Sequence, residues 1–160
     1  MRKPSRQPRW DGSDAGRVRV LLECAPAGSP SIIASAIERR GYEVRMCEGP
    51  TVGSCALLDS GACALVDGAD VVVNMLGTSR CEDPVLRTVA GLRRRPAILA
   101  EVPCAVRGGA DGSDAASLPN MADAITELRQ PVTTKVLFDG IEEALRQREQ
   151  RVEWWGDGFC

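Results

Sequence analysis

The fold is decided by residues 70–77, which read Asp-Val-Val-Val-Asn-Met-Leu-Gly. Three β-branched valines in succession, closed by a glycine, are typical of a short strand that is buried on both faces. Such strands occupy the middle of parallel sheets, and ligands in open α/β sheets bind beyond the carboxyl ends of these strands. Asn74 lies at that end here. The stretch therefore predicts an α/β domain whose functional groups surround Asn74.

Strand and helix patterns alternate along the rest of the chain. Four segments have the apolar or alternating pattern of strands: residues 18–24, 42–47, 71–75 and 97–102. Three have apolar residues at helical spacing: residues 30–40, 83–94 and 134–150. Residues 48–68 are irregular, with two short apolar pieces that fit one broken helix, and residues 121–128 fit a last strand, a short helix or both. This order predicts a doubly wound, five-stranded parallel sheet with helices on both faces, of the flavodoxin-like type.

Composition limits the classes of function. The chain has 160 residues, of which 44% are hydrophobic and 26% are charged, as in a soluble globular domain. The net charge of −2 gives no electrostatic reason for nucleic-acid binding. No run of about 18 apolar residues would span a membrane, and the basic N-terminus lacks the apolar core of a secretory signal. We therefore expect a cytoplasmic protein with no nucleic-acid and no membrane partner.

The two ends of the chain differ in composition from its middle. Residues 1–16 are polar and basic, which predicts a disordered arm, and residues 17–150 form the predicted domain. Three aromatic residues gather in a tail at residues 151–160: Trp154, Trp155 and Phe159. Exposed aromatic side chains either fold back onto their own domain or anchor a partner, and they are enriched at interface hot spots. We expect this tail to dock a protein partner or to form a homodimer.

Three further stretches follow one another in a recognisable order. Residues 18–24 form an apolar strand that ends in Glu-Cys, and residues 40–44 read Arg-Gly-Tyr-Glu-Val. Residues 129–132 read Arg-Gln-Pro-Val and precede a helix that includes residues 138–145, Phe-Asp-Gly-Ile-Glu-Glu-Ala-Leu. In order and spacing they resemble the first strand, the exit of the first helix, and the Lys-Pro signature with the last helix of a response-regulator receiver domain. The resemblance covers residues 18–150.

The resemblance implies a site, and this chain departs from it. Receiver domains hold Mg²⁺ through an acidic pair after the first strand and an aspartate at the end of the third, which accepts a phosphoryl group. A threonine or serine after the fourth strand and a lysine before the final proline sense the phosphate. The corresponding positions here all differ from that pattern: Glu23, Cys24, Asn74, Glu101 and Gln130. The neutral amide of Asn74 is a poor nucleophile, so the resemblance implies a pseudo-receiver that is not phosphorylated.

The ends of the predicted strands also suggest a local arrangement. Because the carboxyl ends of parallel strands meet at one edge of a sheet, we expect Glu23, Asn74 and Glu101 to form a small polar pocket. Two carboxylates in such a pocket bind a cation or share a proton. In the simpler alternative these side chains only cap the neighbouring loops.

Cysteine and histidine usage narrows the chemistry. The chain has seven cysteines and no histidine, which excludes Ser-His-Asp and Cys-His catalysis within the chain. Four of the cysteines surround the irregular segment: Cys47, Cys55, Cys63 and Cys81. Four thiolates hold zinc or an iron–sulfur cluster in other proteins, but the usual Cys-x2-Cys pair is absent here. A redox pair of Cys55 with Cys63 is a further alternative. We favour unliganded thiols and no cofactor.

These observations support two hypotheses about function. The first is a non-phosphorylatable receiver-like signalling module that is not an enzyme and acts by docking a partner protein. The alternative is a cysteine-based sensor of metal, iron–sulfur cluster or redox state on the same fold. An enzyme is the least supported reading, because the sequence has no nucleophile–base pair, phosphate loop or dinucleotide fingerprint.

Overall fold

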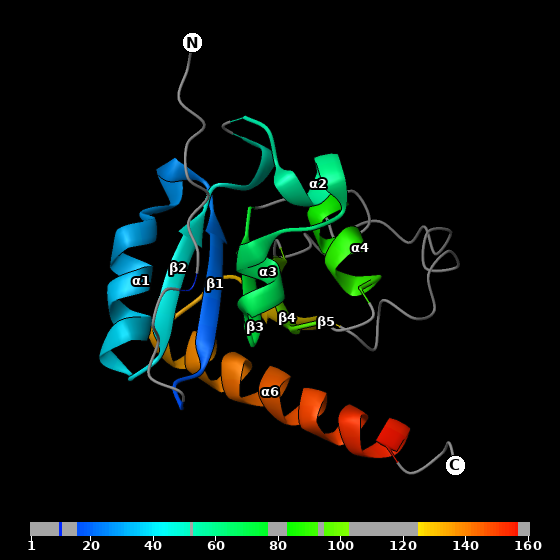
Figure 1. Cartoon of the computed structure of the whole chain (residues 1–160). Helices are drawn as coiled ribbons and strands as arrows, with labels where there is room; N and C mark the ends of the chain where they lie inside the picture. The colour runs from blue at the N-terminus through cyan, green and yellow to red at the C-terminus, as the bar shows by residue number, and fades with distance from the viewer. Residues whose placement is uncertain are drawn as a thin grey trace, which may run out of the picture.

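The computed structural model has a five-stranded, all-parallel sheet at its centre (Figure 1). It describes residue 10 and residues 16–51, 53–76, 83–92, 95–102 and 125–156, without the side chains of residues 51 and 151–156. The strands are β1 (Arg19–Cys24), β2 (Glu43–Cys47), β3 (Val71–Met75), β4 (Ala97–Val102) and β5 (Ile125–Arg129). Their order is β2-β1-β3-β4-β5. The flavodoxin-like fold class is therefore confirmed.

The strand register brings the valines of β3 to the middle of the sheet. Val71 pairs with Val20 of β1 and with Ala97 of β4, and all three valines of β3 are buried. Alternate residues of a strand point to opposite faces, so this strand supplies apolar side chains to both layers. β3 is thus the strand on which both halves of the core are built.

Helices cover both faces of the sheet. On one face, α1 (Pro30–Arg39) and α6 (Thr134–Gly156) pack against Val20, Val71 and Leu99. On the other face, α2 (Ala56–Ser60), α3 (Ala64–Gly68) and α4 (Pro84–Ala90) pack against Leu21 and Val72. Two short 3-10 turns, η1 (Pro26–Gly28) and η2 (Gly49–Thr51), follow β1 and β2. The alternation along each strand therefore decides which helical layer a strand-end side chain faces.

Helix α6 lies against the sheet along a stripe of apolar side chains. Leu137, Ile141 and Ala144 are buried in the core on this side. A Cβ atom at Gly140 would lie 3.0 Å from carbon atoms of Leu128 and Leu99, so the glycine allows a close approach of helix and sheet. Figure 1 shows the C-terminal turns of α6 running past the edge of the sheet.

Asp70 lies at the amino end of β3 and forms hydrogen bonds to three other elements. Its carboxylate accepts a hydrogen bond of 2.9 Å from the Arg19 backbone N–H and one of 3.2 Å from the Arg148 guanidinium. Its carbonyl accepts one from the backbone N–H of Ala97. The side chain and the backbone of one residue therefore hold β1, β4 and α6 together at the amino end of β3.

The two apolar pieces of the irregular segment form two short helices, α2 and α3, separated by Gly61 with a φ of 74°. The structure differs from the sequence-based expectation in one element. The last helix was expected to stop at Gln150, and it continues to Gly156. No proline or glycine lies between Gln150 and Gly156, so the sequence contains no signal that would end the helix at Gln150.

Trp10 lies within the arm that the sequence predicts to be disordered, and the structure places it against the domain. Its indole Nε1–H donates a hydrogen bond of 2.8 Å to the Leu65 carbonyl. The guanidinium groups of Arg19 and Arg45 lie 5.8 and 5.9 Å from its ring centroid. A Cβ atom at Gly68 would lie 2.2 Å from the indole, so this glycine provides the space for the ring. Residues 1–9 and 11–15 lie outside the described residues.

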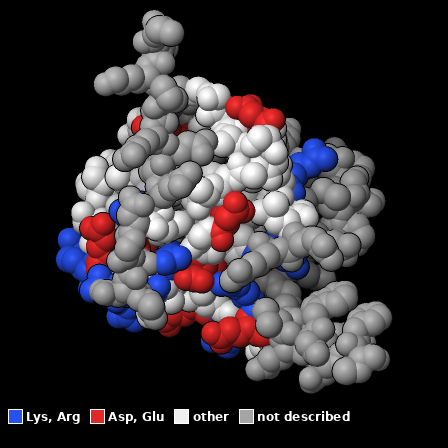
Figure 2. Space-filling view, viewed as in Figure 1, with Lys and Arg blue, Asp and Glu red and all other residues white. Residues whose placement is uncertain are grey.

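The distribution of surface charge and the character of the helices indicate which partners are possible. Figure 2 shows acidic and basic side chains interspersed along the lower edge of the face in view, and the described part of that face has no continuous basic patch. Among the described residues, no helix combines the length and the apolar character needed to cross a membrane.

Candidate functional site

Two polar side chains meet at the carboxyl ends of β1 and β3. Glu23 and Asn74 are partners in the strand register. Leu21 and Val72, two residues earlier in each strand, belong to the core beneath α2, α3 and α4. Because side chains alternate along a strand, Glu23 and Asn74 point to that same layer. The sequence correctly predicted that these two residues would come together.

The amide of Asn74 bridges two carboxylates. Its Nδ2 donates a hydrogen bond of 2.9 Å to Oε2 of Glu23 and one of 3.1 Å to Oδ2 of Asp83. Its Oδ1 accepts a 3.4 Å contact from the backbone N–H of Leu76. The side chains of all three bridged residues are almost inaccessible, at 2% exposure each. Both N–H groups of one neutral amide are therefore used between two buried acids.

Asp83 was not predicted as a site residue. Its Oδ1 accepts hydrogen bonds from the backbone N–H groups of Val85 (2.8 Å) and Leu86 (3.1 Å), so it caps the N-terminus of α4. An aspartate directly before Pro84 is the usual signal of a helix start, and it was visible in the sequence as such. The cap uses Oδ1 and Asn74 donates to Oδ2, so one carboxylate both begins a helix and completes the site.

The electrostatics of the site centre on Glu23. Burial raises the pKa of Glu23 from its ordinary value of 4.5 to about 7; the hydrogen bond from Asn74 opposes this rise and the nearby carboxylate of Asp83 adds to it. Near neutral pH, the protonated and the ionised form of Glu23 are therefore close in free energy. The amide supplies donors to both acids without supplying a positive charge.

Glu101 does not join this group, which corrects the predicted pocket. Leu99 of β4 faces α6, and Glu101, two residues later, faces the same side. Ala100 is the residue of β4 that pairs with Asn74. Glu101 instead accepts a hydrogen bond of 3.0 Å from Nε2 of Gln130 at the surface. The prediction was wrong because it counted strand ends without counting the alternation of faces.

Cys24 also faces the α1 and α6 layer. It is buried in that core, and its thiol donates a 3.4 Å hydrogen bond to the Ala25 carbonyl. Burial raises the pKa of Cys24, and the charge of Glu101 adds to the rise. The five positions indicated by the resemblance thus separate into two groups: Glu23 and Asn74 on one face, and Cys24, Glu101 and Gln130 on the other.

Comparisons with known proteins concern the fold. No protein-family model and no curated protein matches the sequence. A response regulator receiver domain protein from Clostridium thermocellum aligns with a TM-score of 0.54 at 17% identity, over 83% of this chain and 98% of that chain. The signal receiver domain of a Luxo repressor protein from Vibrio parahaemolyticus aligns with a TM-score of 0.55 at 15% identity, over 89% and 99%. A CheY-like receiver domain protein from Methanospirillum hungatei aligns with a TM-score of 0.55 at 14% identity, over 84% and 98%.

The chain has the receiver fold. At these identities the likeness concerns the arrangement of helices and strands, so the chemistry of the strand ends must be read from the side chains themselves. In this receiver fold, the end of β3 carries an amide that is buried and hydrogen-bonded on both N–H groups.

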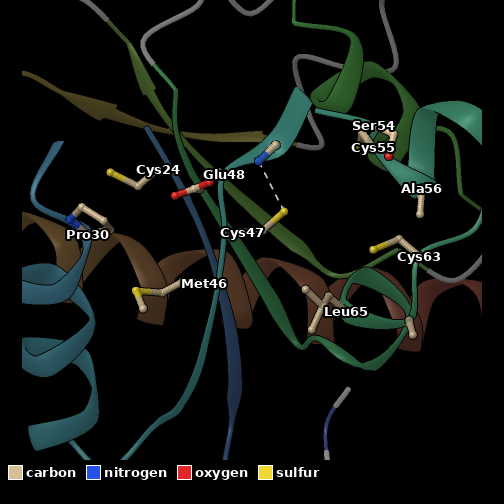
Figure 3. Close-up of a pocket in the computed structure, with 12 residues that line it drawn as sticks. Cys24, Pro30, Met46, Cys47, Glu48, Ser54, Cys55, Ala56, Cys63 and Leu65 are labelled. Carbon is tan, nitrogen blue, oxygen red and sulfur yellow. Dashed lines mark hydrogen bonds between the residues drawn. The ribbon is translucent and has the colours of Figure 1, made fainter. Parts of the chain in front are cut away.

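The cysteines of the irregular segment surround a cavity of about 480 Å³ (Figure 3). Cys47, Cys55 and Cys63 are half-buried free thiols that line the cavity, and the buried free thiol of Cys24 lines it as well. Within the described residues, no three Cys, Asp, Glu or His side chains are grouped so that they could hold a metal ion. Cys81, the fourth member of the predicted cluster, lies outside the described residues.

The predicted docking residues lie at the end of the chain. The backbone of Trp154 and Trp155 belongs to α6, so these residues stand on a helix and not in a separate tail. Their side chains and the whole of Phe159 lie outside the described residues.

Proposed function

We propose that this chain is a receiver-like signalling module that works without phosphorylation and without catalysis, by docking a partner protein. The observation that carries the proposal is the bridge from Asn74 to Glu23 and Asp83. This bridge lies at the strand end where the resemblance places the phosphoryl acceptor.

The chemistry of the bridge opposes phosphoryl transfer. The nitrogen lone pair of an amide is delocalised, and both N–H groups of Asn74 are engaged with buried acids. Mg²⁺ binds best to anionic oxygen ligands, and an amide replaces one of them here. Burial raises the pKa of Glu23 to about 7, so this second oxygen ligand is only partly ionised near neutral pH. Acceptor and cation site are both impaired.

The last helix offers a place for docking. α6 has 23 residues, and among its described side chains, residues 134–150, the buried stripe ends near Ala144. The later turns extend past the sheet in Figure 1, and they include Trp154 and Trp155. Tryptophan is enriched in the energetic centres of protein interfaces. We propose that this end of α6, together with Phe159, contacts a protein partner or a second copy of the chain.

Phosphorylation is tested by incubating the protein with acetyl phosphate and Mg²⁺ and measuring its intact mass. We expect no phosphoryl adduct on the wild-type protein. The Asn74→Asp variant is the matched control, because it restores a carboxylate at the same strand end. An adduct that forms on the wild-type protein and depends on Mg²⁺ would contradict the proposal.

Docking is tested by placing a photo-crosslinking amino acid at one end of α6 or the other. A crosslinker in place of Trp155 is expected to give a covalent product with a partner protein or a second copy. A crosslinker in place of the exposed Lys135, in the first turn of the same helix, is the control. Equal yields from both positions would exclude the C-terminal end of α6 as the docking surface.

A second candidate function is a cysteine-based sensor of metal, iron–sulfur cluster or redox state. Four free thiols that line one cavity support it: those of Cys24, Cys47, Cys55 and Cys63. Its metal-binding forms would need Cys81 as an additional ligand, because the described residues contain no such site. Metal analysis and a thiol count on anaerobically purified protein test it: stoichiometric zinc or iron would favour the sensor, and fully reactive thiols without metal would exclude its metal-binding forms.

A further inference from the structure

The cavity beside the irregular segment has the size of a small-molecule site. Its volume of about 480 Å³ lies within the range of roughly 300–1,000 Å³ that is usual for ligand pockets. It lies between the end of β2 and the first turns of α2 and α3, where Ala56, Ala64 and Leu65 contribute apolar surface. This is a different place from the bridge at Asn74, whose residues do not line it.

Thiols supply much of the remaining lining. Figure 3 shows the side chains of Cys47 and Cys63 pointing toward one another across the hollow, with Cys55 on the same side of β2. Cys55 and Cys63 stand at the N-cap positions of α2 and α3, and neither thiol makes a capping hydrogen bond. Both are half-buried, so a small molecule in the cavity would reach them. Both residues also pack against the core beneath α2, α3 and α4, so their thiols lie between that core and the cavity.

Cys47 differs from the other two thiols. Its Sγ accepts a hydrogen bond of 3.3 Å from the backbone N–H of Gly49. Burial raises its pKa; the Gly49 hydrogen bond opposes the rise, and Glu23, Cys63 and Cys55 add to it. A thiol held in its protonated form is a weak nucleophile. The Sγ atom of Cys47 is also engaged by the backbone of Gly49, whereas Cys55 and Cys63 line the cavity from the starts of α2 and α3 without capping either helix. We therefore place a reaction inside the cavity at Cys55 and Cys63.

The lining also selects the charge of a ligand. Glu48 is the charged residue among the described lining residues, and no Lys or Arg belongs to them. An anion would lose its hydration without gaining a cationic partner. A neutral carbon skeleton would bury apolar surface against leucine, alanine and sulfur atoms. A peroxide, which has no such skeleton, would gain nothing from this surface.

We propose that the cavity is a covalent capture site for small, uncharged α,β-unsaturated carbonyl compounds, with Cys55 and Cys63 as the nucleophiles. The thiol first releases its proton to water. The thiolate sulfur then forms a bond to the β-carbon, the carbon–carbon π bond breaks, and the α-carbon takes a proton from water. The sum of thiol and alkene is a thioether, so no oxidant, reductant or leaving group is required.

Two maleimides with the same reactive group but different charge test this proposal: neutral N-ethylmaleimide and anionic maleimidopropionate. Reaction at each cysteine is followed by peptide mass mapping, with glutathione as the reference thiol. We expect Cys55 or Cys63 to react with the neutral reagent roughly tenfold faster than glutathione does, because the cavity holds the reagent beside the sulfur. The rate should saturate with reagent concentration, and the anionic reagent should show no acceleration.

Variants separate the cavity from the intrinsic reactivity of its thiols. Ala64→Leu and Ala56→Leu each narrow the cavity and keep every cysteine, and we expect either to abolish the acceleration. Ser60→Leu introduces the same side chain at an exposed position of α2 and should leave the acceleration intact. Circular dichroism identifies variants that fold. The proposal is overturned if neutral and anionic reagents react equally fast, if the rate does not saturate, or if both folded narrowing variants react like the wild-type protein.

Discussion

Nδ2 of Asn74 lies 2.9 Å from Oε2 of Glu23, which joins the ends of two neighbouring parallel strands by a buried side-chain hydrogen bond. The second N–H of the same amide reaches Asp83 at the start of α4. One neutral side chain therefore links β1, β3 and a helix of the covering layer.

The Asn74→Asp substitution should make stability depend on Mg²⁺. Without a cation it would place a third carboxylate beside Glu23 and Asp83, and removing the partner of a buried charge costs about 3–5 kcal/mol of unfolding free energy. Mg²⁺ would recover part of this loss by binding the three acids. Urea unfolding with and without Mg²⁺ measures the effect. The wild-type protein should respond little, and a variant that is equally indifferent to Mg²⁺ would contradict the prediction.

Asp83 should show two separable contributions. Asp83→Ala removes both the cap of α4 and the acceptor for Asn74, whereas Asp83→Ser keeps a capping oxygen and removes only the second contact. We expect the alanine variant to be less stable than the serine variant by about 1 kcal/mol, the usual value of an N-cap. Equal unfolding free energies for the two variants would mean that the cap does not stabilise α4.

Stability should fall as the pH rises through neutrality. The pKa of Glu23 is raised from 4.5 to about 7 in the folded protein, so between these values the folded state binds more protons than the unfolded state. The stabilising contribution is complete below pH 4.5 and is lost as the pH rises through about 7. The raised pKa corresponds to about 3 kcal/mol at most.

The Glu23→Gln variant is the control for this pH dependence. Its neutral side chain resembles protonated glutamic acid and can still accept a hydrogen bond from Asn74. Unfolding free energies measured from pH 5 to pH 8 should decline less steeply for the variant than for the wild-type protein. Parallel curves would assign the pH dependence to other groups.

Removal of the Glu101 side chain should have little effect. Glu101 and Gln130 form an exposed hydrogen bond on the other face of the sheet. Exposed polar pairs contribute about 0–1 kcal/mol, so Glu101→Ala should lower the unfolding free energy by no more than this. The variant should also keep the pH dependence assigned to Glu23. A large loss of stability, or a changed pH dependence, would indicate that Glu101 is coupled to the buried acids after all.

The limits of the sequence-based prediction have physical causes. Glu23 and Asn74 were predicted together because buried parallel strands end at one edge of a sheet. Glu101 was misplaced because the period of two along β4 turns it toward α6, and counting from Leu99 would have revealed this. Asp83 has the signal of a helix cap, and no sequence pattern indicates that its second oxygen reaches a strand end. That relation depends on how α4 packs.

The length of the last helix was underestimated for another reason. The aromatic residues near Trp154 were interpreted as a separate tail, although no residue between Gln150 and Gly156 breaks a helix. The cavity could not be predicted at all, since its lining comes from the ends of several elements whose packing no local pattern specifies.

The contact of Trp10 with the domain has a practical consequence for shortened versions of the protein. A chain trimmed to start at residue 17, where composition places the domain boundary, would lose the indole that fills the space beside Gly68. The Leu65 carbonyl would lose its 2.8 Å donor on α3, one of the two short helices that border the thiol-lined cavity. Ligand binding measured on such a fragment would therefore report on a cavity beside a less well packed α3, and a fragment used for such measurements must include Trp10.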